Sequence, residues 1–364
     1  MIPPGVVRAA LLGLSAVFVA LSLLIVCIRG VRVYRQRRRE RIAAPVRGLL
    51  LQLLCADEDD QSELLHQLTQ IDKRTWRALE PSLTALLGKV AGGARTTLIS
   101  LYELRGAAGD AVAALGSHRA ARRGRAAQVL GQLAHRPAVA PLCRLLADRD
   151  PEVRLAAARA LGRIGDSAAV PHLLECLQGP RPVPPGVVMS ALVSLGPESQ
   201  PRVSAGLRME PLARAVAIEV LGATGAVSRT SEIARALRED PEIEVQIKAA
   251  RALGRLGMPE ALQPLLAALD PDRPVSLRTV SAGALGNLGA VVAESRLVEL
   301  LDDPNTHVAA TAARALLRLG PVGQGALRTA ADHAGGRAAA QARAALAELA
   351  VGGARHGVRV EVAL

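Results

Sequence analysis

The residues that could hold a metal ion or act as nucleophiles are few and scattered. The cysteines are Cys27, Cys55, Cys143 and Cys176. Their spacing is not that of a metal site, and all of them lie in apolar runs. The chain also has no Gly-rich phosphate loop, no nucleophile elbow and no carboxylate pair with a plausible partner. We therefore expect a protein that is not an enzyme, with no catalytic residue, no metal and no cofactor.

Charged residues recur instead at fixed distances before a series of leucines at positions 146, 177, 207, 237, 269 and 301. The positions two and five residues before these leucines lie three apart, so on a helix they share one face. The charges at these positions alternate in sign, which suits a protein segment better than a polyanion. This surface is the candidate partner-binding groove, and its charged or titratable residues are Arg144, His172, Glu175, Arg202, Glu232, Arg235, Arg296 and Glu299.

A six-residue pattern that ends in glycine recurs about every thirty residues. Its best copy is ALGRIG at residues 160–165, and the leucines at its second position are residues 130, 161, 192, 221, 253, 285 and 316. Seven copies at steps of 29 to 32 residues predict a solenoid of stacked units, none of which folds alone.

Each unit is predicted to contain two helices. Four Asp-Pro pairs, at 150–151, 240–241, 270–271 and 303–304, are candidate starts of the first helix, with Asp as the N-cap and Pro at the first helical position. For the third pair, Asp272-Arg273-Pro274 offers a second start. The glycine that closes each pattern favours a left-handed C-terminal cap. A second helix such as 170–177 or 262–269 follows.

The pattern resembles HEAT repeats, most closely the phycobilisome-lyase type. The resemblance is carried by Pro151-Glu152-Val153-Arg154, residues 157–165, Ala169-Val170-Pro171 and Leu173-Leu174. It implies an all-α, right-handed α-solenoid of about nine stacked helix pairs, with the second helices on the concave side. A related di-iron hydroxylase family carries His-Glu dipeptides, but none of the seven histidines here is followed by Glu. No bilin-specific residue can be carried over from the lyases.

The N-terminus contains a predicted transmembrane helix. Residues 9–28 are twenty consecutive residues without a charge, about the length that spans a 30 Å hydrocarbon core. Only Arg8 precedes this run, whereas a dense group of arginines follows it, which argues against a cleaved signal peptide. The positive-inside rule then places residues 1–8 outside and the rest in the cytoplasm. The candidate contacts with anionic lipid headgroups are Arg35, Arg37, Arg38, Arg39 and Arg41.

The net charge of +12 is concentrated near this segment. Residues 1–47 carry nine Arg and one Glu, a net charge of +8, which leaves +4 for the other 317 residues. Only three residues are Lys, and together with the many Ala and Gly this indicates a high-GC bacterial gene. Because aromatic residues make up 1% of the chain, a base-stacking platform is absent and we expect no nucleic-acid partner.

A second basic cluster contains His118, Arg119, Arg122, Arg123 and Arg125, at the start of a predicted first helix. Its charges oppose the helix dipole, at a few tenths of a kcal/mol each. A solvated face explains such a cluster, and docking to an acidic partner or to the membrane is the functional alternative.

Together these features predict a single-pass bacterial membrane protein with a cytoplasmic scaffold or adaptor that binds a protein partner, such as a membrane or cell-envelope protein, at the inner leaflet. The alternative is a lyase-like or other enzyme built on the same repeats. The expected segments are an extracytoplasmic N-terminus (1–8), a transmembrane helix (9–28), a basic juxtamembrane segment (29–41), divergent repeats (42–117), HEAT-like repeats (118–320), capping helices (321–350) and a tail (351–364).

Overall fold

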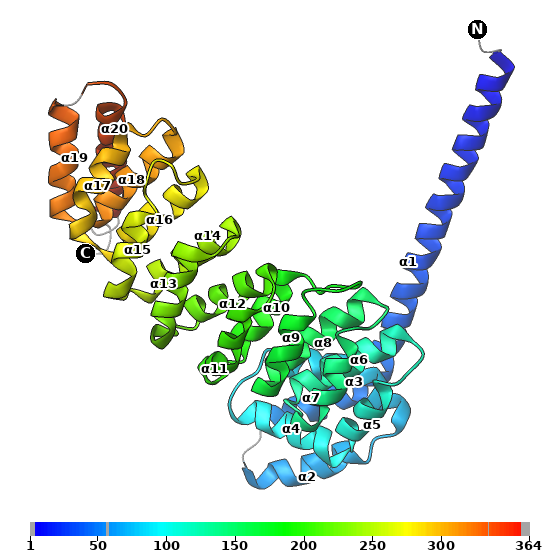
Figure 1. Cartoon of the computed structure of the whole chain (residues 1–364). Helices are drawn as coiled ribbons and strands as arrows, with labels where there is room; N and C mark the ends of the chain where they lie inside the picture. The colour runs from blue at the N-terminus through cyan, green and yellow to red at the C-terminus, as the bar shows by residue number, and fades with distance from the viewer. Residues whose placement is uncertain (1–3, 56–57, 334, 358–364) are drawn as a thin grey trace. The chain divides into compact units, whose positions relative to one another are not determined.

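The computed structural model describes residues 4–55, 58–333 and 335–357, and all regular structure within them is helical (Figure 1). The helices form two compact units, Met1–Ala113 and Ala114–Leu364. The predicted all-α class and the solenoid of paired helices are confirmed.

The first unit contains five helices, the last of which ends at the boundary with the second unit. These are α1 (Pro4–Cys55), α2 (Glu58–Thr69), α3 (Lys73–Leu87), α4 (Gly93–Leu104) and α5 (Ala107–Ala114). Trp76 packs edge-to-face on Tyr102 with ring centroids 5.3 Å apart, and the Arg105 guanidinium lies 4.5 Å from the Trp76 ring centre. Arg105 also donates to the carbonyls of Leu68, Thr69 and Ile71, so it satisfies the C-terminal end of α2.

The second unit is a stack of helix pairs closed by one long helix. The first helices are α6 (Ala120–Gln132), α8 (Pro151–Ile164), α10 (Pro185–Ser194), α12 (Pro211–Ala223), α14 (Ile243–Leu256), α16 (Val275–Leu288) and α18 (Thr306–Arg318). The second helices are α7 (Val139–Leu145), α9 (Val170–Glu175), α11 (Gln200–Val203), α13 (Thr230–Glu239), α15 (Leu262–Ala267), α17 (Glu294–Glu299) and α19 (Pro321–His333), followed by α20 (Gly336–Gly357).

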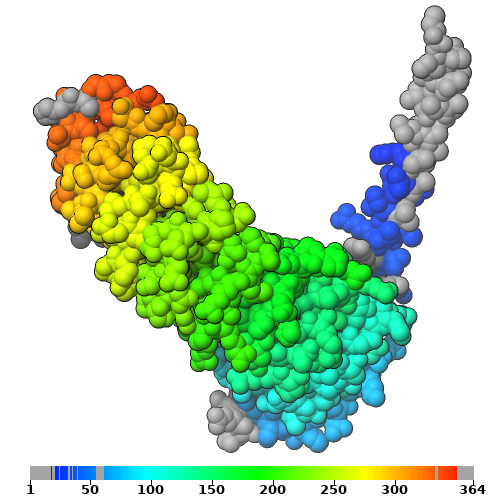
Figure 2. Space-filling view, viewed as in Figure 1, coloured from blue at the N-terminus to red at the C-terminus, as the bar shows by residue number. Residues whose placement is uncertain are grey.

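Short 3-10 turns lead into six of the second helices, and two more extend α11 and α17. They span Arg136–Ala138, Ser167–Ala169, Pro197–Ser199, Ser204–Arg208, Val227–Arg229, Pro259–Ala261, Val291–Ala293 and Leu300–Asp302. In Figure 1 the helices α10, α12, α14 and α16 follow one another along one side of the stack, and α11, α13 and α15 along the other. The space-filling view shows the same stack as a continuous body from green to orange (Figure 2).

The glycines that close the six-residue pattern have positive φ angles, and Gly165, Gly257 and Gly289 form the expected left-handed caps, whereas Gly196 has a ψ of 178° and does not. All six, at positions 165, 196, 225, 257, 289 and 320, have positive φ angles between 63° and 82°. In the copy at residues 129–134 the closing residue is alanine, and Ala134 has a φ of 51°, the one positive value at a non-glycine residue in the described part of the chain. The turn between the two helices therefore imposes this conformation even without glycine.

The predicted helix starts are right at one Asp-Pro pair and wrong at the others. Asp150 caps α8 by accepting from the Glu152 amide, with Pro151 at the first position. The helices α14, α16 and α18 begin two to four residues later than the Asp-Pro pairs predict, at Ile243, Val275 and Thr306. The second of these, α16, uses the other start noted in the sequence, just after Pro274.

The reason is that two of these aspartates bind an arginine of the preceding first helix. Asp240 accepts from Arg214 Nε and Nη2 at 2.8 and 3.0 Å, and its Oδ1 also accepts from the Glu242 amide. Asp303 accepts from Arg278 Nη2 at 3.0 Å and from the Asn305 amide at 2.8 Å. A carboxylate bound in this way fixes the backbone of the two residues after it in a turn. The helix therefore begins after that turn and not at the proline.

Neighbouring first helices approach each other through glycine. At Gly131, Gly162, Gly222, Gly254 and Gly286, a Cβ added to the glycine would come within 2.6–2.8 Å of an alanine in the next first helix. No real Cβ tolerates that distance, because carbon atoms rest at about 3.5–4.0 Å. Glycine thus sets the spacing of the stack, since any side chain at these positions would force the helices apart.

Candidate functional site

The residues of the predicted groove all lie on second helices of the second unit. Arg144 is on α7, His172 and Glu175 on α9, Arg202 on α11, Glu232 and Arg235 on α13, and Arg296 and Glu299 on α17. All eight are exposed or half-buried. The structure brings them onto one series of helices, and their role in binding a partner stays a prediction.

Several of these charges are paired within their own segment of chain. The ion pairs join residues three apart in sequence: His172–Glu175 (3.5 Å), Arg229–Glu232 (2.7 Å) and Arg296–Glu299. Exposed pairs of this kind contribute about 0.2–1 kcal/mol each. Arg144, Arg202 and Arg235 form no ion pair with the residues that the structure describes, so this face offers a mixture of paired and free charges.

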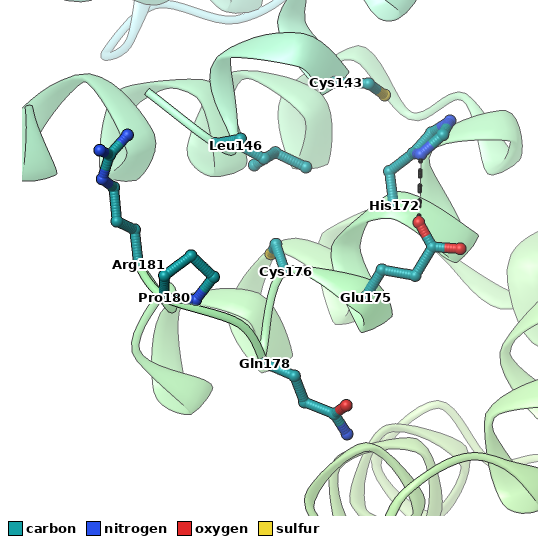
Figure 3. A pocket seen from close by; sticks show the side chains of 9 residues that line it. Cys143, Leu146, His172, Glu175, Cys176, Gln178, Pro180 and Arg181 are labelled. Atoms are coloured by element: carbon teal, nitrogen blue, oxygen red, sulfur yellow. Dashed lines mark ion pairs between the residues drawn. The ribbon is translucent and has the colours of Figure 1, made fainter. Parts of the chain in front are cut away.

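A pocket opens on this face between α7 and α9 (Figure 3). Its volume is about 360 Å³. Its apolar part includes Cys143, Leu146, Cys176 and Pro180, while the ion pair of His172 with Glu175 lies on one side and Arg181 on the other. The pocket therefore combines an apolar lining with charges of both signs at its margin.

The two thiols in this pocket are poor nucleophiles at neutral pH. Burial raises the pKa of Cys143 to about 11 and that of Cys176 to about 12. The Cys176 Sγ also donates to the Leu173 carbonyl at 3.2 Å. The thiolate is the form of cysteine that reacts and that binds metal ions. Because both thiols stay protonated at neutral pH, these side chains contribute apolar surface to the pocket. Within the described residues, no three His, Cys, Asp or Glu side chains gather in a way that could hold a metal ion.

Sequence reasoning found the charged margin of this pocket but missed its lining. Cys143 precedes Arg144 and Cys176 follows Glu175, so both cysteines are one residue away from the predicted column. The loop that supplies Pro180 and Arg181 was not singled out. Its signal was the connection between α9 and α10, which is longer than the other inter-repeat loops and contains several prolines.

The arginine cluster at the start of α6 is only partly available for binding. The Arg123 Nε and Nη2 donate to the two carboxylate oxygens of Asp148, both at 2.7 Å, and the Arg123 side chain is 16% exposed. This is the same inter-helix bond that Arg214 makes with Asp240. The suggestion that Arg123 docks a partner is therefore wrong for this residue, while Arg119, Arg122 and Arg125 are exposed or half-buried.

The predicted membrane segment belongs to α1. In 9–28, the side chains of residues 9–17, 19, 20 and 24 lie outside the described residues, and so do those of Arg35 and Arg39. Arg37, Arg38 and Arg41 are exposed. Among the residues that the structure describes, no helix meets the length and apolarity needed to cross a membrane.

The stacked pairs define an α-solenoid, and the sequence identifies its repeats. Residues 110–195 and 201–286 match the family model of HEAT repeats, which supports the predicted repeats over this part of the chain. No curated protein has a sequence that matches the chain.

Several solved structures match this chain at low identity. An engineered protein is 19% identical over 82% of this chain and 97% of its own, with a TM-score of 0.38. A mutant of the karyopherin Kap121p is 14% identical over 82% of this chain and 40% of its own, with a TM-score of 0.48. The CpcE–CpcF complex of phycocyanin lyase from Nostoc sp. PCC7120 is 23% identical over 79% and 94%, with a TM-score of 0.27.

Proposed function

We propose that this chain is a scaffold that holds a protein partner on the second-helix face of its HEAT repeats. The observation that carries the proposal is the open pocket of about 360 Å³ between α7 and α9, which has an apolar part and charges of both signs at its margin. Such a pocket takes one apolar side chain of a bound segment, while the rim selects the polar groups around it. HEAT repeats offer extended surfaces of this kind.

An enzyme is the less favoured function on these repeats. The pocket's thiols have raised pKa values, and its one histidine is paired with Glu175 at the solvent-exposed margin. A nucleophile needs a lowered pKa or an adjacent base that takes its proton. We propose that this site binds without catalysing a reaction.

The proposal further places the scaffold at the inner leaflet of a bacterial membrane, with its repeats in the cytoplasm. It is supported by the uncharged run at 9–28 and by the apolar residues of α1 that face solvent, such as Phe18 at 71% and Val26 at 66% exposure. A bilayer would cover these side chains. Arg37, Arg38 and Arg41 would contribute about 1 kcal/mol each next to anionic headgroups.

Site-specific photo-crosslinking in native membranes tests the partner site. A crosslinker at Arg144, Glu175 or Arg235 should capture one and the same protein, and a crosslinker at Arg149, in the loop before α8, should not. Reversing the charges of Arg144, Glu175, Arg235 and Glu299 together should abolish that capture. Unchanged capture by this variant would remove the second-helix face from consideration.

Topology needs a separate experiment. A reporter that is active only in the cytoplasm, fused after Leu364, should be active, and one that is active only in the periplasm should be silent. The opposite result would show that the arginine-rich flank has been misinterpreted and that the repeats are exported.

A further inference from the structure

The first helices of the second unit carry pairs of arginines on their solvent side. The pairs occupy the positions two before and two after the repeat leucine, and they are Arg159 and Arg163 on α8, Arg251 and Arg255 on α14, and Arg314 and Arg318 on α18. All six are exposed except the half-buried Arg251. We call these three pairs the first-helix stripe.

The stripe is not neutralised locally. None of its arginines forms an ion pair with a described residue; Arg318 donates to the Asn287 side-chain oxygen at 2.8 Å, and Arg314 to a carbonyl of its own helix. Like charges four residues apart on a helix repel each other. The one acidic residue in the same two columns, Glu219, is bound to Lys248 at 2.7 Å. The stripe therefore has an unbalanced positive charge, unlike the second helices with their mixed signs.

The contact between α10 and α12 is looser than that between the other neighbouring first helices, and it leaves a gap at the surface of the stack. Between the other first helices, a glycine at the third position of the pattern meets an alanine at the first position of the next copy, but here Val193 and Val220 occupy those two positions. The side chains do not fit the close approach, and Val193 is left 36% exposed. The repeat step is also the shortest, from Leu192 to Leu221.

The gap is a groove of about 730 Å³ on the first-helix side. Met189 and Val193 of α10 and Ala223 of α12 give it an apolar lining, with Ser190 and Ser194 at the positions that hold arginine in α8. Arg255 of the stripe is at its margin. Glu219 of α12 also lines the groove, and its charge is paired with Lys248 at 2.7 Å. In the order of the stack, the groove lies between the arginine pair of α8 and that of α14.

We propose that the first-helix side is a second binding surface, which takes an acidic segment of a protein partner with one apolar side chain in the α10–α12 groove. Adjacent packed helices lie about 8–10 Å apart, so α8 and α14 are separated by three such steps, or about 27 Å. An extended segment of about eight or nine residues covers that distance. Its acidic ends meet the two arginine pairs, and its apolar centre meets Met189 and Val193.

A protein segment fits this surface better than a nucleic acid. Residues 114–364 contain no Phe, Trp or Tyr, so no base can stack on an aromatic ring there. The groove is apolar where a phosphate backbone would need a continuous positive track. The surface is distinct from the second-helix face of the proposed function, and either one can fail without the other.

Fluorescence anisotropy of a labelled peptide with the full chain in lipid nanodiscs tests this inference. The peptide has about nine residues, with acidic residues on each side of a central leucine, and a second peptide has serine in place of the leucine. The combined substitution R159Q, R163Q, R251Q and R255Q should weaken binding roughly tenfold, because exposed charge pairs contribute modestly and add up.

A matched control removes the same number of charges from the second helices, by R144Q, R202Q, R235Q and R238Q, and should change the affinity less than twofold. Equal weakening by both sets would overturn the proposal in favour of nonspecific attraction. Circular dichroism on all variants should show unchanged helix content, since every substituted position is exposed or half-buried.

The groove is tested by Val193→Asn, which should abolish the preference for the leucine peptide over the serine peptide. Val292→Asn, at a valine that is 71% exposed, should preserve that preference. If Val193→Asn leaves it intact, the apolar part of the proposal is wrong. Tighter binding of single-stranded DNA or of anionic vesicles than of either peptide, lost in the first-helix variant, would overturn the choice of a protein ligand.

Discussion

The close contact between α14 and α16 makes a glycine-to-alanine change in a helix destabilising. A Cβ at Gly254 would lie 2.7 Å from the Cβ of Ala284 and 2.8 Å from its Cα. Since the second of these atoms is backbone, the helices must move apart by nearly 1 Å to restore normal contact. Overpacking of this kind costs about 1–3 kcal/mol, whereas alanine gains about 1 kcal/mol in helix propensity. The net expectation for Gly254→Ala is a loss of about 1 kcal/mol.

Gly283, in the middle of α16, is the matched control. A Cβ there would meet only the Thr311 Cγ2 at 3.7 Å, an ordinary contact. Gly283→Ala should therefore keep the propensity gain and stabilise its helix by about 1 kcal/mol. The same substitution in adjacent helices should thus change the local stability in opposite directions, and the two variants should differ by about 2 kcal/mol in that stability.

Hydrogen exchange is the suitable assay, because a solenoid opens locally and a single unfolding midpoint is not well defined for it. Amide protection in α14 and α16 should fall about fivefold in Gly254→Ala and rise by a similar factor in Gly283→Ala, since 1.4 kcal/mol corresponds to a factor of ten. Increased protection in both variants would refute the argument that glycine sets the distance between first helices.

Three further predictions concern single residues of the second unit. Ala134→Gly should stabilise the turn between α6 and α7 by about 1 kcal/mol, measured as increased amide protection in these two helices, because Ala134 has a φ of 51° and glycine adopts that conformation without strain. Leu253→Asp buries a charge at a fully buried position, so amide protection should be lost in α14 and α16 and retained in α6 and α8; uniform loss would contradict a stack of neighbour contacts. Burial raises the pKa of Asp148, but hydrogen bonds from Arg123 and the Asp150 amide outweigh it and hold that pKa below its usual value. The resulting stability is complete above the unfolded-state pKa of about 3.9 and is lost as the pH falls through the lower folded-state pKa. Asp148→Asn should remove this part of the acid sensitivity, seen as a smaller loss of amide protection in α6 and α8 below pH 4.

The fold could be predicted from the repeat pattern because that pattern depends on residues that are close together in the sequence. A leucine and a closing glycine at a period of about 31 residues place two helices and the turn between them, and the positive φ angles of Gly165 and Gly257 confirm that turn. The same information shows which positions are exposed on the second helices. Predictions of this kind depend only on residues within one helix or one turn.

The predictions that failed depend on contacts between repeats. Asp240 looks like an N-cap in the sequence, and its carboxylate instead binds Arg214, 26 residues earlier. Arg123 looks like part of a solvated cluster, and Asp148, 25 residues later, holds it. A carboxylate has two oxygens and several possible donors, and only the packed structure decides which donors reach it. The groove at Val193 was not predicted, because it also depends on the contact between two repeats. Its one signal in the sequence is the short repeat step from Leu192 to Leu221.

The spacing of the arginine pairs is itself constrained by the close packing of the first helices. The pairs occur on α8, α14 and α18, and no two adjacent first helices both carry one. Two unit charges about 9 Å apart in water repel each other by about 0.5 kcal/mol before salt screening. Two arginine pairs on adjacent helices would make four such contacts. Their summed repulsion would exceed the stability that an exposed ion pair usually contributes. Glycine brings these helices together, and charge repulsion then spaces the pairs apart. Between the pairs of α8 and α14 the stack has room for a groove with an apolar lining, formed by α10, which carries no charge, and by α12, whose Glu219 is bound by Lys248. An acidic segment with an apolar centre therefore matches this side of the molecule.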